Sequence, residues 1–449
     1  MTAPFLILLV AVIAYMTIVN MQKNAEANIQ QYRSVAMSNA KGELHDKVTM
    51  VYDMVANEYA LLSNNTVLEA RYGKREKNVV EVANAVLRDL NAKVQADELS
   101  LLEAQNQAKA QIANMRYNDN SGYLWINDTS KPFPKMVMHP IMPSLNGTLL
   151  RDEKLNTPLD SNENLFTAAV ALTEKEGAGF INYQWMKSST ADQAKQMQTK
   201  MSYVSLFEPW GWVVGSSGFN VDKVKNNGIT AIKEKVSKLR YDNGEGYFFI
   251  ISDKLPYPTT VMQPVAPKLN GMLMNQPKWN NIALNGTEHM FTAMVKVTRN
   301  PKGEGFVDYV WNKPTASGVT EQGVPKLSFE KAFKPLNWII GSGIYIDNID
   351  KAVEEKRIEI KSQVNRLIKT IIGAALLVLL VSLLVSYWFA NNLSKALSEL
   401  TKLSQKISLG KGLDEEIAST ARDDEIGQLA RAIERLQTSV KMMMIRMKR

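Results

Sequence analysis

Two uncharged, hydrophobic stretches stand out along the chain, one at its beginning and one near its end. Residues Pro4–Val19 carry no charged side chain. Thr370–Ala390 are again uncharged, with Tyr387 and Trp388 close to the end of the stretch. A helix of about 20 apolar residues crosses a bilayer, and aromatic side chains gather at the two interfaces. The pattern therefore predicts two membrane-spanning helices in contact with a lipid bilayer.

We place these helices at 4–21 and 367–390, with both termini in the cytoplasm and the region between them outside. A cleaved signal peptide is the alternative for the first stretch, but that stretch lacks a basic beginning and a small-residue cleavage site. Because the chain starts almost inside the first helix, we expect a short cytoplasmic segment to precede it in the complete protein.

Helical periodicity dominates residues 22–115. This region holds no proline and only two glycines, Gly42 and Gly73. Its apolar residues recur three or four positions apart, which is typical of amphipathic helices. We therefore predict long helices that leave the membrane, with a break at Gly73. The apolar positions are Val48, Val51, Val55, Tyr59 and Leu62 in one run, and Val79, Val82, Val86 and Leu90 in the next.

After Arg116 the pattern changes to short runs of β-branched and aromatic residues, separated by Gly, Pro, Asn and Asp. Such runs favour strands joined by turns. A helical stretch, 164–175, lies among them. The predicted strands fall at 122–127, 135–140, 179–185 and 211–218.

The same sequence pattern occurs twice, with a nearly constant offset in residue number. The pair Gly122-Tyr123 recurs 124 positions later as Gly246-Tyr247. Further matches keep the same order, which chance does not explain, so we infer an internal duplication of one α+β module of about 110 residues. The two modules would occupy 116–225 and 226–355. Other matched positions are Leu145-Asn146-Gly147 with Leu269-Asn270-Gly271, Gly179-Phe180 with Gly305-Phe306, and Pro209 and Trp212 with Pro335 and Trp338.

A heptad pattern follows the second hydrophobic stretch, over 391–445. Apolar residues alternate in steps of three and four, which is the seam of a coiled coil, and Gly410 lies between two such runs. Because a seam needs a partner, we expect a homodimer with a parallel four-helix bundle. The seam positions are Leu393, Leu397, Leu400, Leu403 and Ile407, then Ile426, Leu429, Ile433, Leu436, Val440, Met443 and Met447.

The composition of the chain argues against several kinds of partner and site. The formal charge of +8 is modest for 449 residues and forms no long basic blocks, which argues against a nucleic-acid partner. The chain has no cysteine, so disulfides, thiolate catalysis and zinc–thiolate sites are excluded. Its three histidines, His45, His139 and His289, are far apart in sequence. We therefore expect no metal and no other cofactor.

Enzyme motifs are also missing. The Gly-Ser-Ser-Gly run at 215–218 lacks the frame of a nucleophile elbow, and no glycine-rich loop fits a nucleotide. We expect a protein that is not an enzyme.

The repeated segments resemble the Cache family of extracellular sensor domains, in the branch found in bacterial chemoreceptors that bind small carboxylates. The residues that carry the resemblance are RYNDNSGYLWIND (116–128), MVMHPIMPSLNG (136–147), GFINYQW (179–185) and EPWGWVVGSSG (208–218), with their counterparts in the second copy. The resemblance implies an α+β fold in which two PAS-like antiparallel sheets are strung on a long helix. It also implies that the first module is membrane-distal and the second membrane-proximal, outside a bacterial inner membrane.

The segment after the second hydrophobic stretch resembles a HAMP relay. Asp424-Glu425-Ile426-Gly427 matches the opening of that family's second helix. One departure is Ala396, which stands where the family often has proline, so we expect a straighter junction between the membrane helix and the relay.

A buried carboxylate ligand needs charge-assisted donors and aromatic walls. Strand alternation puts Lys200 and Tyr203 on opposite faces of one strand, so the candidates cannot all face one pocket. Some have structural alternatives: Trp125 as core, Arg116 as a brace of the strand edge, and His139 as a structural histidine. The candidate ligand-binding residues of the first module are Arg116, Tyr123, Trp125, His139, Lys200 and Tyr203.

The second module keeps Lys326 at the position of Lys200 but departs elsewhere. Gln263 replaces His139, Phe249 replaces Trp125, and Phe329 replaces Tyr203. We therefore expect the first module to bind the ligand and the second mainly to transmit.

Together these inferences predict a transmembrane sensory receptor for a small, carboxylate-like metabolite, of the chemotaxis type. The signal would pass through HAMP to a cytoplasmic signalling protein or to a signalling domain beyond Arg449. Two alternatives stay open: the input half of a histidine kinase or cyclic-dinucleotide enzyme, and a periplasmic ligand-binding protein without a signalling role.

Overall fold

The computed structural model describes residues 2–155, 157–159, 163–186, 197–279, 288–315 and 318–447. The chain divides into two compact units. Residues 40–346 form the central unit. Residues 1–39 and 347–449 together form the terminal unit.

Four helices precede the first sheet: α1 (Thr2–Ser63), α2 (Asn65–Tyr72), α3 (Lys74–Gln95) and α4 (Leu101–Ala113). The break at Gly73 is confirmed, because this residue ends α2 and precedes α3. Two other breaks come from capping residues. Asn64 accepts a hydrogen bond from the backbone of Val67, and Ser100 forms a capping box with Glu103.

The first module is a six-stranded antiparallel sheet, with strands in the order β2-β1-β5-β4-β3 and β6 paired with β4. The helix α5 (Leu165–Glu176) lies between β2 and β3 in sequence, and α6 (Val221–Lys238) follows β6. The strands are β1 (Leu124–Asp128), β2 (Met136–Met138), β3 (Ala178–Met186), β4 (Met197–Phe207), β5 (Trp212–Ser216) and β6 (Phe219–Asn220).

The second module repeats this topology. Its order β10-β11-β12-β8, with β9 paired with β8, matches β3-β4-β5-β1 and β2 strand for strand. Registers match as well, since Trp125 pairs with Gly215 and Phe249 pairs with Gly341. The duplication and the α+β prediction are confirmed. The elements are β7 (Arg240–Tyr241), β8 (Gly246–Ser252), β9 (Thr260–Met262), α7 (Met290–Lys296), β10 (Glu304–Thr315), β11 (Gly318–Phe333) and β12 (Trp338–Tyr345).

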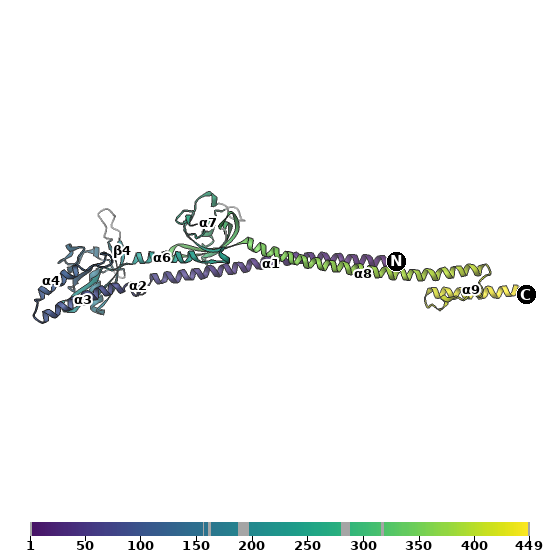
Figure 1. Ribbon diagram of the computed structural model, residues 1–449, viewed down its shortest axis with the longest axis horizontal. Coiled ribbons are helices and arrows are strands. Elements are labelled where there is room, and N and C mark those ends of the chain that lie inside the picture. Colours follow the sequence, from purple (N-terminus) through teal and green to yellow (C-terminus); the bar gives the residue numbers. More distant parts are fainter. Residues whose placement is uncertain are drawn as a thin grey trace. The chain divides into compact units, whose positions relative to one another are not determined.

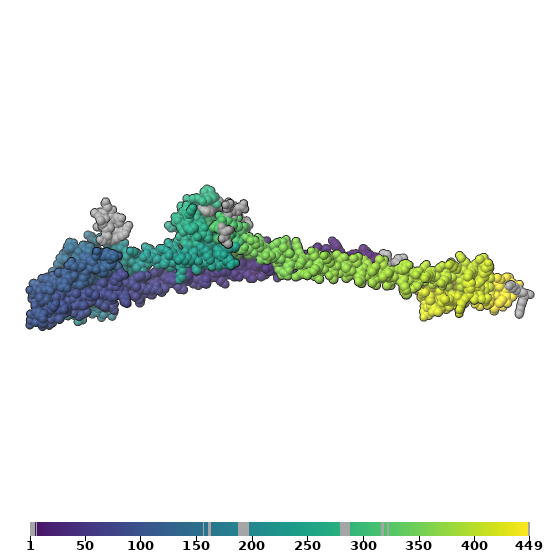
Figure 2. Space-filling model, in the orientation of Figure 1, coloured from purple at the N-terminus to yellow at the C-terminus, as the bar shows by residue number. Residues whose placement is uncertain are grey.

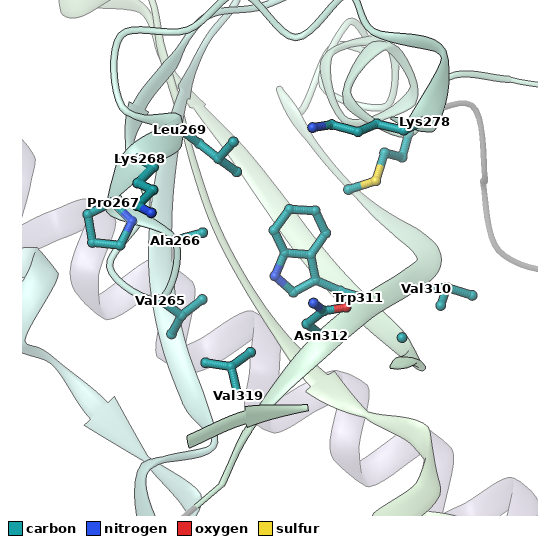
Figure 3. A pocket seen from close by; sticks show the side chains of 12 residues that line it. Val265, Ala266, Pro267, Lys268, Leu269, Lys278, Val310, Trp311, Asn312 and Val319 are labelled. Carbon is teal, nitrogen blue, oxygen red and sulfur yellow. The ribbon is translucent and has the colours of Figure 1, made fainter. Parts of the chain in front are cut away.

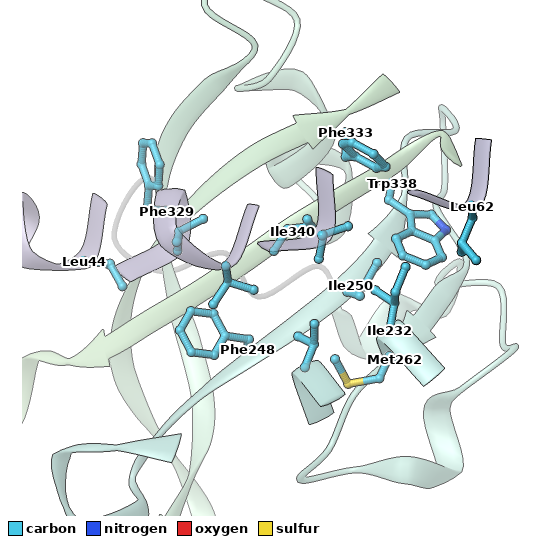
Figure 4. Packing of buried hydrophobic residues seen from close by; sticks show 14 residues of the cluster. Leu44, Leu62, Ile232, Phe248, Ile250, Met262, Phe329, Phe333, Trp338 and Ile340 are labelled. Carbon is cyan, nitrogen blue, oxygen red and sulfur yellow. The ribbon is translucent and has the colours of Figure 1, made fainter. Parts of the chain in front are cut away.

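Long helices cover one face of each sheet. On the first sheet, Leu87 of α3 and Ile112 of α4 pack on Ile126 and Val214. On the second, α1 supplies the covering side chains, among them Leu44 and Leu62, which pack with Ile340 and its neighbours (Figure 4). Truncating one such buried leucine to alanine costs roughly 2–5 kcal/mol.

The opposite face of each sheet packs against a short helix. Phe166 of α5 belongs to one of these clusters with Trp125 and Tyr183. Phe291 of α7 belongs to the corresponding cluster of the second module, which also contains Tyr247 and Trp311. Of the candidate ligand residues, Tyr123, Trp125 and His139 line a pocket on this second kind of face.

The terminal unit contains the first part of α1 and the helix α8 (Ile346–Ser408) (Figure 1). Both helices contain a window long and apolar enough to cross a membrane, and none of either window is buried. Large apolar side chains of α8, such as Leu380 and Trp388, are exposed. Figure 2 draws the surface of this helix in green to yellow-green. Outside these windows α1 and α8 are joined by ion pairs: Arg33 to Asp350 at 2.8 Å and Glu26 to Arg357 at 3.4 Å.

The end of α8 folds back on α9 (Glu425–Met447) around a small core that contains Leu400, Ile407 and Ala430. The connector is tied to α9 by side chains. Arg431 donates to the carbonyl oxygens of Thr420 and Arg422, and Gln437 donates to those of Gly412 and Glu415. Helix α8 runs without a break through Ala396, as the missing proline predicted.

Candidate ligand site

A small pocket in the first module brings three of the candidate residues together. Its volume is about 10 Å³, which is room for about one water molecule. Tyr123 and Trp125 reach it because alternate residues of a strand share a face. The lining consists of Tyr123, Trp125, His139, Leu165, Phe166, Tyr183 and Trp185.

His139 is buried, and its hydrogen bonds define its tautomer. Its Nδ1 accepts a hydrogen bond from the backbone N–H of Met142 at 2.9 Å, so the ring proton belongs on Nε2. Burial, with a smaller effect of the Lys200 charge, lowers the pKa of His139 to about 4. At neutral pH the residue is therefore an uncharged N–H donor, and its ring is tilted against the Tyr123 ring with 5.2 Å between the ring centres.

Lys200 lies next to this pocket. Its Nζ donates to the carbonyl oxygen of Ser217 at 3.2 Å and lies 5.8 Å from the centre of the Tyr123 ring. Burial lowers its pKa, while Glu76 acts in the opposite direction. Since an ammonium group has three donors and Ser217 receives one, Lys200 can also donate to a ligand.

A buried carboxyl group, which the sequence did not reveal, completes the cluster. Glu76 of α3 is 1% exposed, and it accepts a hydrogen bond from the Tyr117 hydroxyl at 2.6 Å. That hydroxyl also lies 3.0 Å from Ser217 Oγ. Burial raises the pKa of Glu76, and hydrogen bonds from Tyr117 and Ser216 partly oppose this. A chain of polar contacts thus links α3 to Ser217 and, through it, to Lys200.

The repeat contained one signal for this network. Tyr117 recurs as Tyr241, and the Tyr241 hydroxyl also contacts β12 of its own module, at Ser342 Oγ (2.6 Å) and the carbonyl oxygen of Gly343 (3.1 Å), whereas Tyr117 lies 3.0 Å from Ser217 Oγ. Nothing in the local sequence indicated Glu76, because it lies on another element, 41 positions before Tyr117.

The structure does not bring Arg116 and Tyr203 to this pocket. Arg116 is exposed, and its guanidinium donates to the carbonyl oxygens of Ala113 and Met115 at the end of α4. Arg116 therefore has a structural role, at the end of a helix and not at the edge of a strand. Tyr203 packs on the helix-covered face of the sheet, 5.0 Å from the Phe180 ring. Its separation from Lys200 follows from the strand alternation noted in the sequence.

The second module buries the equivalent lysine more deeply. Lys326 is 0% exposed, and among the described residues its Nζ has no hydrogen-bond partner. It lies 3.9 Å from the Tyr247 ring centre and 4.8 Å from that of Tyr345. Burial lowers the pKa of Lys326 to about 7. Glu330, on the same strand face, has a pKa raised well above its usual range by burial.

Within the described part of the chain, no three His, Asp or Glu side chains come together in a way that could hold a metal ion. The pocket and its surroundings instead hold donors suited to an anion, namely the Lys200 ammonium, the neutral His139 imidazole and the Tyr123 phenol, while the Glu76 carboxyl group is bonded to Tyr117.

Comparison with known proteins decides the family. A Cache domain family model (dCache_2) matches residues 21–230 and 220–371, which together cover most of the chain. The chain belongs to the Cache family. A HAMP domain model matches residues 388–442 of this Cache protein. Its sensor region is extracytoplasmic and is flanked by two membrane-spanning helices, α1 and α8.

Curated relatives of this Cache protein include two receptors. The methyl-accepting chemotaxis protein McpP of Pseudomonas putida is 37% identical over 153 residues, which are 34% of this chain and 26% of that protein. The methyl-accepting chemotaxis protein CtpM of Pseudomonas aeruginosa is 29% identical over 143 residues, 32% of this chain and 24% of that protein. The matched stretches thus span about a quarter of the length of these relatives.

Among solved structures, one described as "Structural basis for carboxylic acid recognition by a Cache chemosensory domain" is 34% identical to the Cache protein. It covers 35% of this chain and 99% of its own, with a TM-score of 0.30.

Proposed function

We propose that this chain is the sensory portion of a transmembrane chemoreceptor that binds a small organic carboxylate in its first module and signals through HAMP. The Cache and HAMP matches and the chemotaxis relatives support the receptor class. The ligand class is supported by the cluster of Lys200, Tyr123 and His139.

That cluster is the observation that carries the proposal. A carboxylate taken out of water must be paired and hydrogen-bonded. Lys200 supplies a positive charge, and His139 supplies an uncharged Nε2–H that remains a donor at neutral pH. Tyr123 and Trp125 supply the aromatic walls. A cationic ligand would meet the Lys200 ammonium, whereas the Glu76 carboxyl group is already bonded to Tyr117.

The pocket is almost filled in this conformation, so binding requires the lining side chains to move. Trp185 is the half-buried member of the aromatic group, which makes it the side chain that most easily yields. Binding would then favour one of two side-chain arrangements, which is the differential affinity that a receptor needs to shift its population.

The signal has a continuous covalent path. In the second module β12 ends at Tyr345, and α8 starts at the next residue and continues to Ser408. A small displacement of the strand would thereby be passed to the membrane helix and to the HAMP hairpin, on the scale of the 1–2 Å shifts known for interface helices.

The test uses the full chain in lipid nanodiscs, with acetate, propionate, lactate and pyruvate as probes in isothermal titration calorimetry. Lys200→Ala should weaken the binding of the best probe by roughly 10- to 100-fold, since a hydrogen bond to a charged group contributes about 1.5–3 kcal/mol. Arg116→Ala is the matched control, because it removes a positive charge outside the pocket, and it should leave affinity unchanged.

Equal losses in the Lys200 and Arg116 variants would contradict the assignment of the site. Binding of the corresponding small amines, in place of the carboxylates, would contradict the assignment of the ligand.

A further inference from the structure

The second module contains a cavity of about 570 Å³, much larger than the pocket of about 10 Å³ beside His139. This falls in the range of small-molecule sites, which are about 300–1,000 Å³. The cavity lies between the loop that follows β9 and the hairpin of β10 and β11. Figure 3 shows the indole of Trp311 in the middle of its lining.

The cavity has an apolar body. Leu269, Met290 and Val319 line it around Trp311. Packing fixes the position of Trp311. It belongs to a buried cluster with Tyr247 and Phe291, and it meets the Phe291 ring edge-on, with 6.1 Å between the ring centres. A fixed indole of this kind offers a flat surface on which an aromatic ring can stack.

The charged side chains that line the cavity are positive. Among the described residues that line it are two lysines, Lys268 and Lys278, and no acidic side chain. Both lysines are exposed, and in Figure 3 they lie on opposite sides of the Trp311 indole. Two ammonium groups at the rim of an apolar cavity are complementary to an anion that carries a hydrophobic body.

A buried lysine lies deeper in the same module. Among the described residues the Lys326 Nζ has no hydrogen-bond partner, and it lies 3.9 Å from the centre of the Tyr247 ring, which shares a core cluster with Trp311. Glu330 faces the same interior, but burial favours its neutral form. The interior behind the cavity therefore adds no negative charge to oppose an anion.

We propose that this cavity is a second ligand site, for an aromatic monocarboxylate, with the ring on Trp311 and the carboxylate between Lys268 and Lys278. The proposal goes beyond the function given above, since it names another site and another ligand class. It also changes the expected role of the second module, which then senses as well as transmits. The site differs from the first in its size and in the exposure of its cations.

Phenylacetate is the probe, titrated into the full chain in nanodiscs by isothermal titration calorimetry. We expect binding that weakens by roughly 10- to 100-fold in the double variant Lys268→Glu/Lys278→Glu. Both positions are exposed, so folding should be preserved, and the melting temperature checks this. The matched control is Lys254→Glu/Lys334→Glu, which changes the charge of the same module equally at exposed positions away from the cavity, and it should bind as the unaltered chain does.

Three outcomes would overturn the proposal. The first is no heat from phenylacetate at millimolar concentration. The second is an equal loss in both double variants, which would indicate a general effect of charge. The third is equally tight binding of phenethylamine, which has a similar ring but the opposite charge.

Lys200→Ala separates this site from the first one. It should leave phenylacetate binding intact even if it abolishes the binding of short carboxylates, so each proposal can fail without the other.

Discussion

At the base of the pocket in the first module, Trp125 lies across Gly215, its neighbour on the paired strand. A Cβ added at position 215 would come within 2.2 Å of the Trp125 ring. The second module has the same arrangement, where a Cβ at Gly341 would lie 2.5 Å from the Phe249 ring. The glycine is therefore needed to let a large ring lie flat over the strand.

Gly215→Ala should displace Trp125, destabilise the first module by about 1–3 kcal/mol and weaken ligand binding. Thermal melting and titration of the same variant measure both effects. Gly42→Ala is the control, since its added Cβ meets nothing within 4 Å on a helix, where alanine is favoured. Equal stability of the two variants would mean that Trp125 does not depend on Gly215.

Protonation of His139 should make stability depend on pH. Burial lowers the pKa of His139 from 6.5 to about 4. Between these values the unfolded chain binds the proton and the folded chain does not, so stability is complete above about pH 6.5 and falls as the pH is lowered. At about pH 5 the loss should be on the order of 2 kcal/mol.

The measurement is denaturant unfolding at about pH 7 and about pH 5. His139→Gln provides the comparison, because Gln263 occupies the equivalent position in the second module. The acid-induced loss should be smaller in this variant. The same loss in both proteins would show that other groups cause it.

Individual side chains were predictable where local geometry governs them. Strand alternation separated Lys200 from Tyr203 and kept Tyr123 with Trp125, because the side-chain period of a strand is two. Arg116 was among the candidates, but its contacts with carbonyl groups at the end of α4 depend on where that helix ends. Glu76 could not be found, because its contact with Tyr117 depends on how α3 packs against the sheet.

At the level of elements, the sequence located β1, β2, β3, β5 and α5 of the first module, and the duplication extended this pattern to the second module. The breaks at Asn64 and Ser100 were missed, since neither involves glycine or proline and a cap is visible only once the helix end is known. In the C-terminal hairpin, the seam itself divides into two groups. Ile426, Ile433 and Val440 pack on the hairpin core, whereas Leu429 and Leu436 are 44% and 50% exposed.

The exposed group predicts where a second copy should contact α9. The chain has no cysteine, so a single introduced thiol reports proximity without background. Leu436→Cys should form a disulfide-linked dimer in oxidised membranes, detectable on non-reducing gels. Glu434→Cys, also exposed on α9 but turned away from Leu436, should cross-link much less. Equal yields from the two positions would argue against a dimer seam along Leu429 and Leu436.

At the level of the whole molecule, the sequence established the order of the parts: membrane helix, duplicated module, membrane helix, HAMP. It did not establish which module has room for a ligand. The cavity beside Trp311 is much larger than the pocket beside His139, although the second module lacks the histidine and the tryptophan that made the first the better candidate. The size of this cavity depends on how loops and hairpins pack around Trp311, and a local sequence pattern does not predict that packing.

The unbroken course of α8 has a geometric consequence. A helix of 63 residues extends roughly 95 Å, and each residue turns it by about 100°. No proline at position 396 interrupts the helix. The direction in which Leu400 and Ile407 point therefore depends on the number of residues that separate them from the start of α8 at Ile346. Adding or deleting one residue anywhere along this rod would change its phase and point the HAMP core toward a different neighbour, while a change of seven residues would nearly restore it.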